Sequence, residues 1–112
     1  MKYALLCYNA KDAWDGVPEN EQKAIYGEYA ALTEAPGIFG GSQLRPVESA
    51  TTVRVENGQT LLTPGPFVHA KEYLGGFYLL EADDLDAATA IAARIPAARM
   101  GGAVEVRPIV ES

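Results

Sequence analysis

The chain has 112 residues, of which 48% are hydrophobic and 21% are charged, a balance typical of one folded domain spanning residues 1–112. Its formal net charge of −6, with nine scattered basic residues, argues against a nucleic-acid partner, because phosphate binding needs clustered lysines and arginines. No apolar run approaches a membrane span, and the opening MKYALLCYN lacks a signal-peptide cleavage pattern, so we expect a cytoplasmic protein that is not bound to a membrane.

The first predicted strand covers residues 3–8, where apolar side chains occupy both odd and even positions. This pattern is typical of a central strand that is covered on both faces. Cys7 is the only cysteine, so no intramolecular disulfide can form, and its place in this run favours a buried packing thiol.

Residues 18–35 predict a helix. Ile25, Tyr29 and Leu32 recur at helical spacing, and polar residues take the other side. Pro18 suits the first turn of this helix, and the Pro-Gly pair at 36–37 ends it.

A short strand and a hairpin are expected next. Residues 38–46 predict a strand that Pro46 would end or confine to a sheet edge. Residues 50–55 and 59–62 flank an Asn-Gly pair at 57–58, which is typical of a type I′ turn in a β-hairpin.

The second half of the chain repeats this plan. Residues 77–82 predict another strand with apolar groups on both faces, and residues 103–107 predict the last strand. Between them, Asp83 or Asp84 would begin a second helix that ends before Pro96. Its apolar side would carry Leu85, Ala88, Ala92 and Ile95.

This order of elements predicts an α+β, ferredoxin-like fold of the dimeric α/β-barrel type, with an antiparallel sheet, two helices on one face and an inserted β-hairpin. The helices can cover one face only, yet the strands at 3–8 and 77–82 are apolar on both. We therefore expect a homodimer in which two sheets pack face to face. A small-molecule cleft would lie between sheet and helices or at the dimer seam.

Residues 63–76, TPGPFVHAKEYLGG, hold the only histidine. His69 is the first candidate general acid or base, because histidine exchanges a proton near neutral pH, and Glu72 or Lys71 would be its catalytic partner. The alternative is a structural corner with an ordinary loop histidine and a solvated pair of opposite charges.

Candidate ligand-binding residues are Arg45, as an anion contact, together with Phe67 and Tyr8. Trp14 and the six tyrosines could also line a cleft, although such residues more often belong to a core or an interface.

We expect no metal and no cofactor. One histidine and one cysteine cannot supply a usual zinc site. Asp83, Asp84 and Asp86 lack the further ligands of a calcium loop, and helix capping explains them. None of the three glycine pairs has a nucleotide-binding pattern.

Five segments resemble the DGPF proteins, a branch of the YCII-related superfamily. They are ATTVR at 50–54, GPF at 65–67, KE at 71–72, LGGFY at 74–78 and VEVRP at 104–108. The resemblance runs from Lys2 to nearly the last residue and implies a dimeric ferredoxin-like fold without a settled activity. Because DGPF proteins are often encoded near extracytoplasmic-function sigma factors, it also implies a sigma factor or other regulator as a partner.

Two positions depart from the D-G-P-F-A-E-T-K-E-x-L-G-G signature of that family, since Pro64 replaces the aspartate and His69 replaces the glutamate. The His-Asp pair that some YCII-related proteins use has its histidine on the first helix, and residues 19–35 contain none. Our leading interpretation is therefore a small dimeric protein that binds a small molecule or acts as a regulatory accessory. The alternatives are a lyase- or isomerase-type enzyme using His69 and an interaction module for a sigma factor.

Overall fold

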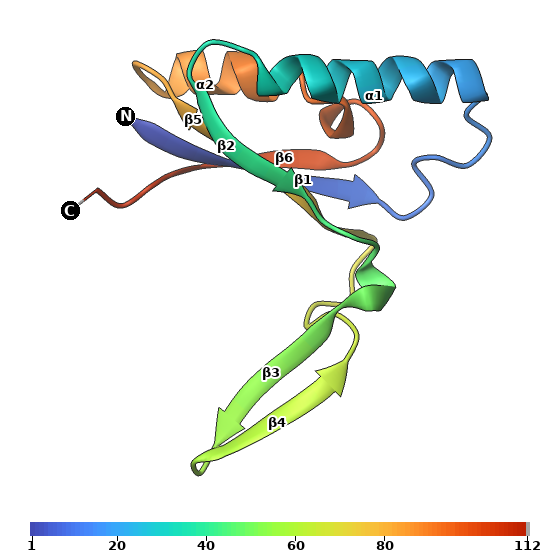
Figure 1. Cartoon of the computed structure of the whole chain (residues 1–112), viewed down its shortest axis with the longest axis vertical. Coiled ribbons are helices and arrows are strands. Elements are labelled where there is room, and N and C mark those ends of the chain that lie inside the picture. Colours follow the sequence, from blue (N-terminus) through green and yellow to red (C-terminus); the bar gives the residue numbers. More distant parts are fainter. Residues whose placement is uncertain (112) are drawn as a thin grey trace.

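The computed structural model describes residues 1–111, which form the expected α+β fold (Figure 1). The main strands are β1 (Lys2–Ala10), β2 (Ile38–Gln43), β5 (Glu72–Glu81) and β6 (Ala103–Pro108), and the helices are α1 (Glu19–Thr33) and α2 (Leu85–Ala92). The four strands form one antiparallel sheet in the order β2-β5-β1-β6, with β2 at an edge as predicted. Both helices lie on the same face of this sheet.

The two central strands bury the side chains that face the helices. Tyr3, Leu5 and Cys7 of β1 are buried, and Leu5 lies opposite Tyr78 of β5. Because directly paired residues share a face, Tyr78 and the buried Leu80 join the same layer. This layer and the helices enclose the hydrophobic core.

Helix α1 follows its predicted periodicity. Ile25 and Leu32 are buried, and Tyr29 packs against the core. Pro18 immediately precedes the helix and does not enter its first turn, and its carbonyl accepts a hydrogen bond from the Gln22 amide at 2.9 Å. None of the helices within residues 1–111 is long and apolar enough to cross a membrane.

Helix α2 begins after Asp84, whose side chain accepts a hydrogen bond from the Ala87 amide at 2.8 Å. Ala88 and Ala92 are buried as expected. Leu85 is 53% exposed, so its predicted place on the apolar side is wrong. It is the first residue of the helix and precedes the buried Ala88 and Ala92. The short 3-10 helix η2 (Pro96–Ala98) then leads toward β6.

Strand β5 begins at Glu72, five residues earlier than the predicted strand. Its first part pairs with the end of β1, where Cys7 lies opposite Gly76 and Tyr8 lies opposite Leu74. The register shift leaves Gly75 as an extra residue, which is a β-bulge. Glu72 therefore belongs to the sheet and not to the preceding loop.

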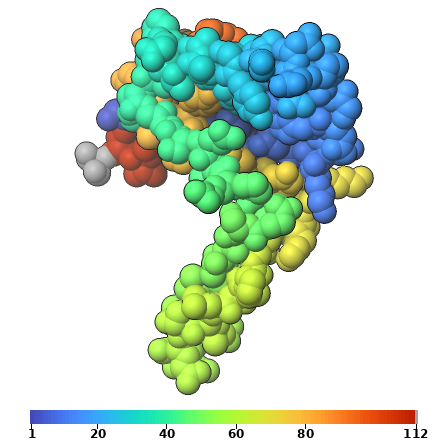
Figure 2. All heavy atoms as spheres, turned by 45° about the vertical axis from the view of Figure 1, so that its right-hand side comes forward, coloured from blue at the N-terminus to red at the C-terminus, as the bar shows by residue number. Residues whose placement is uncertain are grey.

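The inserted hairpin follows the 3-10 helix η1 (Val47–Ser49) and consists of β3 (Thr51–Glu56) and β4 (Gln59–Pro64), which form a separate two-stranded sheet. Asn57 and Gly58 have φ values of 50° and 76°, which confirms the predicted type I′ turn. Figure 1 shows the hairpin on the side of the main sheet away from the helices, and Figure 2 shows it standing clear of the body.

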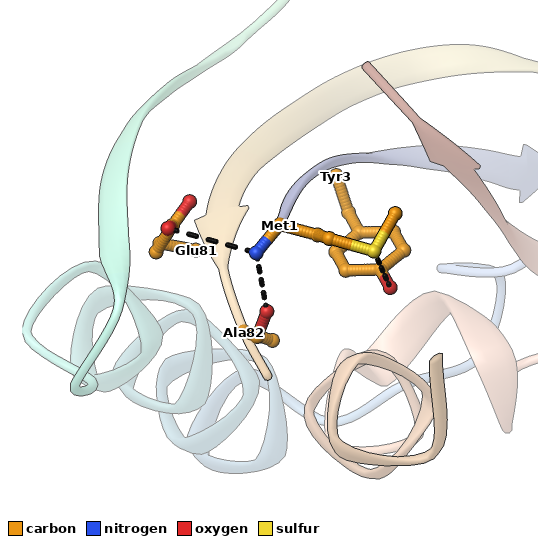
Figure 3. A network of polar contacts seen from close by, with 4 residues as sticks. All are labelled: Met1, Tyr3, Glu81 and Ala82. Atoms are coloured by element: carbon orange, nitrogen blue, oxygen red, sulfur yellow. Dashed lines mark hydrogen bonds and ion pairs between the residues drawn. The ribbon is translucent and has the colours of Figure 1, made fainter. Parts of the chain in front are cut away.

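The beginning of β1 is joined to the end of β5 by polar contacts (Figure 3). The terminal ammonium of Met1 donates to the carbonyl of Ala82 at 2.9 Å and lies 3.6 Å from the carboxylate of Glu81. The hydroxyl of Tyr3 donates to the sulfur of Met1 at 3.7 Å. The amide of Ala82 in turn donates to the carbonyl of Met1 at 2.9 Å, so the β1–β5 ladder extends to this end.

Candidate functional site: an aromatic cleft beside α1

A cleft of about 770 Å³ lies between α1 and the β2–β5 side of the sheet. Helix α1 contributes Tyr26, Tyr29, Ala30 and Thr33, and Trp14 comes from the loop between β1 and α1. This volume lies within the range of about 300–1,000 Å³ that is usual for small-molecule sites.

Glycines open the sheet side of this cleft. The four that line it are Gly40, Gly41, Gly75 and Gly76. Gly41 has a φ of 141°, and a Cβ at this position would collide with the carbonyl oxygen of Phe77. A Cβ on Gly76 would lie 2.9 Å from the carbonyl oxygen of Ser42. The close approach of β2 and β5 therefore requires glycine at both positions, and these glycines leave room for a ligand.

Aromatic side chains form much of the remaining wall. The indole of Trp14 stacks on the ring of Tyr26, with centroids 5.2 Å apart and planes inclined by 20°. The hydroxyl of Tyr78 donates to the backbone carbonyl of Tyr29 at 2.9 Å, which holds Tyr78 against α1. Phe39 and Phe77 also border the cleft, but the pairing of Phe77 with Leu6 turns its side chain to the sheet face away from the helices.

No charged side chain among residues 1–111 lines the cleft. Its polar groups are the amides of Asn9 and Gln43, the hydroxyls of Thr33 and Ser42, and the groups carried by the tyrosines and Cys7. The same part of the chain contains no cluster of three or more His, Cys, Asp or Glu side chains that could hold a metal ion.

Burial keeps the Cys7 thiol and the Tyr78 hydroxyl of the cleft in their neutral forms at physiological pH. Burial raises the pKa of the Cys7 thiol to about 11 and that of the Tyr78 hydroxyl to about 12. Burial is also the largest cause of the raised pKa of Tyr29. The walls therefore offer flat apolar surfaces and uncharged hydrogen-bonding groups.

The predicted catalytic residues lie outside this cleft. His69 and Lys71 are exposed in the loop before β5, and Glu72 is the exposed first residue of that strand. Within the described residues, neither His69 nor Lys71 forms an ion pair with Glu72. The Lys71 carbonyl accepts a hydrogen bond from the Lys11 amide at 3.1 Å, so this residue has a structural contact. The catalytic role of the three residues stays a prediction.

The predicted ligand-binding residues also lie elsewhere. Arg45 is exposed just beyond β2, and Tyr8 is half-buried on the sheet face away from the helices. The ring of Phe67 is 64% exposed and lies beneath the guanidinium of Arg54, whose central carbon is 4.8 Å from the ring centroid. None of the three predicted residues lines the cleft, and their binding role likewise stays a prediction.

The sequence does not predict most of the residues that line the cleft. It indicates only that Trp14 and tyrosines could line one. The useful signal is the pair of glycines at 40–41 together with the pair at 75–76. These pairs have no nucleotide-binding pattern, but they fall on neighbouring strands and leave one wall without bulky side chains.

Comparisons with known proteins agree with this fold. A family model described as the YCII-related domain matches residues 1–112. The uncharacterized protein R00369 of Rhizobium meliloti (strain 1021) is 33% identical over 114 residues, which cover 97% of this chain and 92% of that protein.

A solved structure with a similar fold is that of 5-chloro-2-hydroxyhydroquinone dehydrochlorinase (TftG) from Burkholderia phenoliruptrix AC1100, in complex with 2,5-dihydroxybenzoquinone. The match has a TM-score of 0.54 and covers 100% of this chain and 96% of that one. Because the two sequences are 16% identical, the likeness concerns the fold alone.

Proposed function

We propose that this chain, which belongs to the YCII-related domain family, binds a small, flat, uncharged aromatic molecule in the cleft beside α1. The observation that carries this proposal is a cleft of about 770 Å³ whose lining includes the aromatic residues Trp14, Tyr26, Tyr29 and Tyr78 and, within residues 1–111, no charged side chain. Aromatic walls favour flat rings through stacked and edge-to-face contacts. Neutral amides and hydroxyls can then orient the ring by hydrogen bonds.

The bound molecule in the TftG structure supports a flat ring as the shape of the ligand. That protein holds 2,5-dihydroxybenzoquinone, which is a flat six-membered ring, on a similar fold. In the present cleft, uncharged walls favour a neutral phenol or quinone over a carboxylate or phosphate. A charged ligand would lose hydration there without gaining an opposite charge.

The first test is a binding titration with hydroquinone, 1,4-dihydroxybenzene, followed by saturation-transfer NMR. Cyclohexane-1,4-diol, which has similar hydroxyls but no aromatic ring, should bind much more weakly. Trp14→Ala should weaken hydroquinone binding by about 3- to 10-fold, the value of one aromatic contact. Phe67→Ala is the matched control, because it removes an exposed aromatic ring outside the cleft.

The outcomes of this titration separate the cleft from the loop. Unchanged binding in Phe67→Ala together with weaker binding in Trp14→Ala supports the cleft. No saturation transfer to hydroquinone, or an equal loss in the two variants, contradicts the proposal.

We propose binding as the main role, because the lining that residues 1–111 give the cleft contains no histidine and no charged side chain, and burial raises the pKa of its Cys7 thiol to about 11. The alternative is a lyase- or isomerase-type enzyme in which His69 acts as acid or base with Glu72 or Lys71. Once turnover of any substrate is found, full activity in His69→Ala would exclude that mechanism.

The finer family assignment is also a proposal. The segments GPF at 65–67, KE at 71–72 and LGGFY at 74–78 support the DGPF branch and, with it, a cytoplasmic regulatory protein that contacts a sigma factor. A pull-down from the native host with tagged protein tests this partner. Recovery of no sigma factor or other regulator would contradict the interaction.

We further propose that the chain is a homodimer joined through the sheet face away from the helices. The register places Leu6 opposite Phe77 and Ala4 opposite Leu79 on this face, and Leu74 beside them is 40% exposed. A second copy would remove these apolar side chains from water. Sedimentation at micromolar concentration should give a dimer, and a clean monomer would contradict this assembly.

A further inference from the structure

The hairpin of residues 51–64, called the arm below, has one apolar and one polar face. Val53 pairs with Leu62 and Val55 pairs with Thr60, and paired residues project on the same side. Val53, Val55 and Leu62 are 59%, 67% and 66% exposed, so the apolar face is bare. The opposite face carries Thr52, Arg54, Glu56, Gln59, Leu61 and Thr63. Such an alternation of apolar and polar side chains is typical of a strand pair whose apolar face is covered by another layer.

Nothing in the described part of the chain covers the apolar face of the arm. Every residue of β3 and β4 except Thr52 is exposed. Figure 2 shows the arm extending away from the body without a neighbouring layer. An isolated two-stranded hairpin is only marginally stable in water, so an arm with this pattern needs a partner surface.

The chain exposes more surface than a compact monomer of its mass. The accessible surface is 7744 Å², whereas a compact monomer of this mass would expose about 6,000 Å². The Cα radius of gyration is 15.9 Å, compared with about 13 Å for a compact domain of this length. This excess of about 1,700 Å² arises from the extended shape and leaves more than the roughly 800 Å² that each partner buries in a standard interface available to a second copy.

The position of the arm matches the homodimer proposed above. The arm projects on the same side as the uncovered face of the main sheet, so a copy seated on that face would lie beside it (Figure 1). In a two-fold symmetric dimer each copy presents the same surfaces, so each arm would contact the other copy.

We infer that the arm is a dimerisation element whose apolar face, formed by Val53, Val55 and Leu62, packs against a second copy of this chain. This inference rests on the proposed homodimer and adds a second contact surface to the sheet face. The base of the arm is suited to that role, because the Gly65 amide donates to the Ala50 carbonyl at 2.7 Å and holds its two ends together.

The test compares charge on the two faces of the arm by sedimentation over a range of concentrations. The double variant Val53→Asp with Val55→Asp places two carboxylates on the apolar face. The matched control, Gln59→Asp with Thr63→Asp, adds the same charge to the polar face. We expect the dimer dissociation constant to rise about a hundredfold or more in the first variant and less than about threefold in the control.

A second measurement does not depend on disrupting the dimer. Val55→Cys and Gln59→Cys are treated separately with a maleimide, and Cys7 contributes little background because it is buried. In the dimer, the thiol at position 55 should react at least about tenfold more slowly than the thiol at position 59. Dilution to the monomer should remove this difference.

The outcomes distinguish the arm from the dimer itself. If wild-type protein is a dimer but the thiols at positions 55 and 59 react equally fast, the arm inference is overturned and the sheet-to-sheet dimer stands. If wild-type protein is a monomer at all concentrations, the arm inference and the homodimer both fail. Ligand binding in the cleft is measured independently by the hydroquinone titration.

Discussion

The Cys7 thiol reports how well the floor of the cleft is shielded from water. Its side chain is 4% exposed, and burial raises its pKa from 9.0 to about 11. The unfolded chain therefore releases this proton at lower pH than the folded chain does. The contribution of the thiol to stability is complete below pH 9.0 and is lost as the pH rises toward about 11.

The expected loss can be calculated from these values. Raising the pKa of the thiol from 9.0 to about 11 corresponds to at most about 2.7 kcal/mol of stability, of which about 2 kcal/mol is lost at about pH 10.5. Burial also raises the pKa of Tyr78 from 10.0 to about 12, and this hydroxyl adds a loss of about 1 kcal/mol at the same pH.

The assay is urea unfolding of wild-type protein and Cys7→Ala at about pH 8 and about pH 10.5. The variant starts less stable because a small cavity replaces the thiol. Between the two pH values, the free energy of unfolding should fall by about 2 kcal/mol more in wild-type protein than in Cys7→Ala. An equal fall in both proteins would refute the account of a shielded thiol.

Three other substitutions test separate parts of the fold by urea unfolding. Tyr78→Phe removes the hydroxyl that donates to the backbone of α1 and should cost about 1 kcal/mol; an unchanged stability would contradict that bond. Asp84→Ala should cost about 1 kcal/mol through loss of the cap of α2, whereas Asp83→Ala should change little. Gly41→Ala should cost about 2 kcal/mol or more because its Cβ meets backbone atoms, whereas Gly27→Ala, in open space on α1, should stabilise by about 0.5–1 kcal/mol.

Local patterns in the sequence predict much of this fold. The runs of apolar residues at 3–8 and 77–82 correctly predict the two central strands, because short apolar runs of this kind are typical of strands inside a sheet. The Asn-Gly pair at 57–58 predicts its turn because both residues tolerate positive φ. These features depend on neighbouring residues, so the sequence alone defines them.

The features that the sequence does not predict depend on contacts between distant segments. The early start of β5 results from pairing with β1 across the bulge at Gly75. The cleft depends on the β2–β5 register, which brings Gly41 and Gly76 beneath one side of α1. His69 is the only histidine in the sequence, yet the structure places it outside the cleft.

The most direct test of the proposed function is an amide chemical-shift map of ¹⁵N-labelled protein titrated with hydroquinone. The account predicts that the largest saturable shifts occur at Gly40, Gly41, Gly75 and Gly76 and at the indole of Trp14. Shifts centred on residues 67–72, or no saturable shifts, would contradict the assignment of the cleft as the binding site.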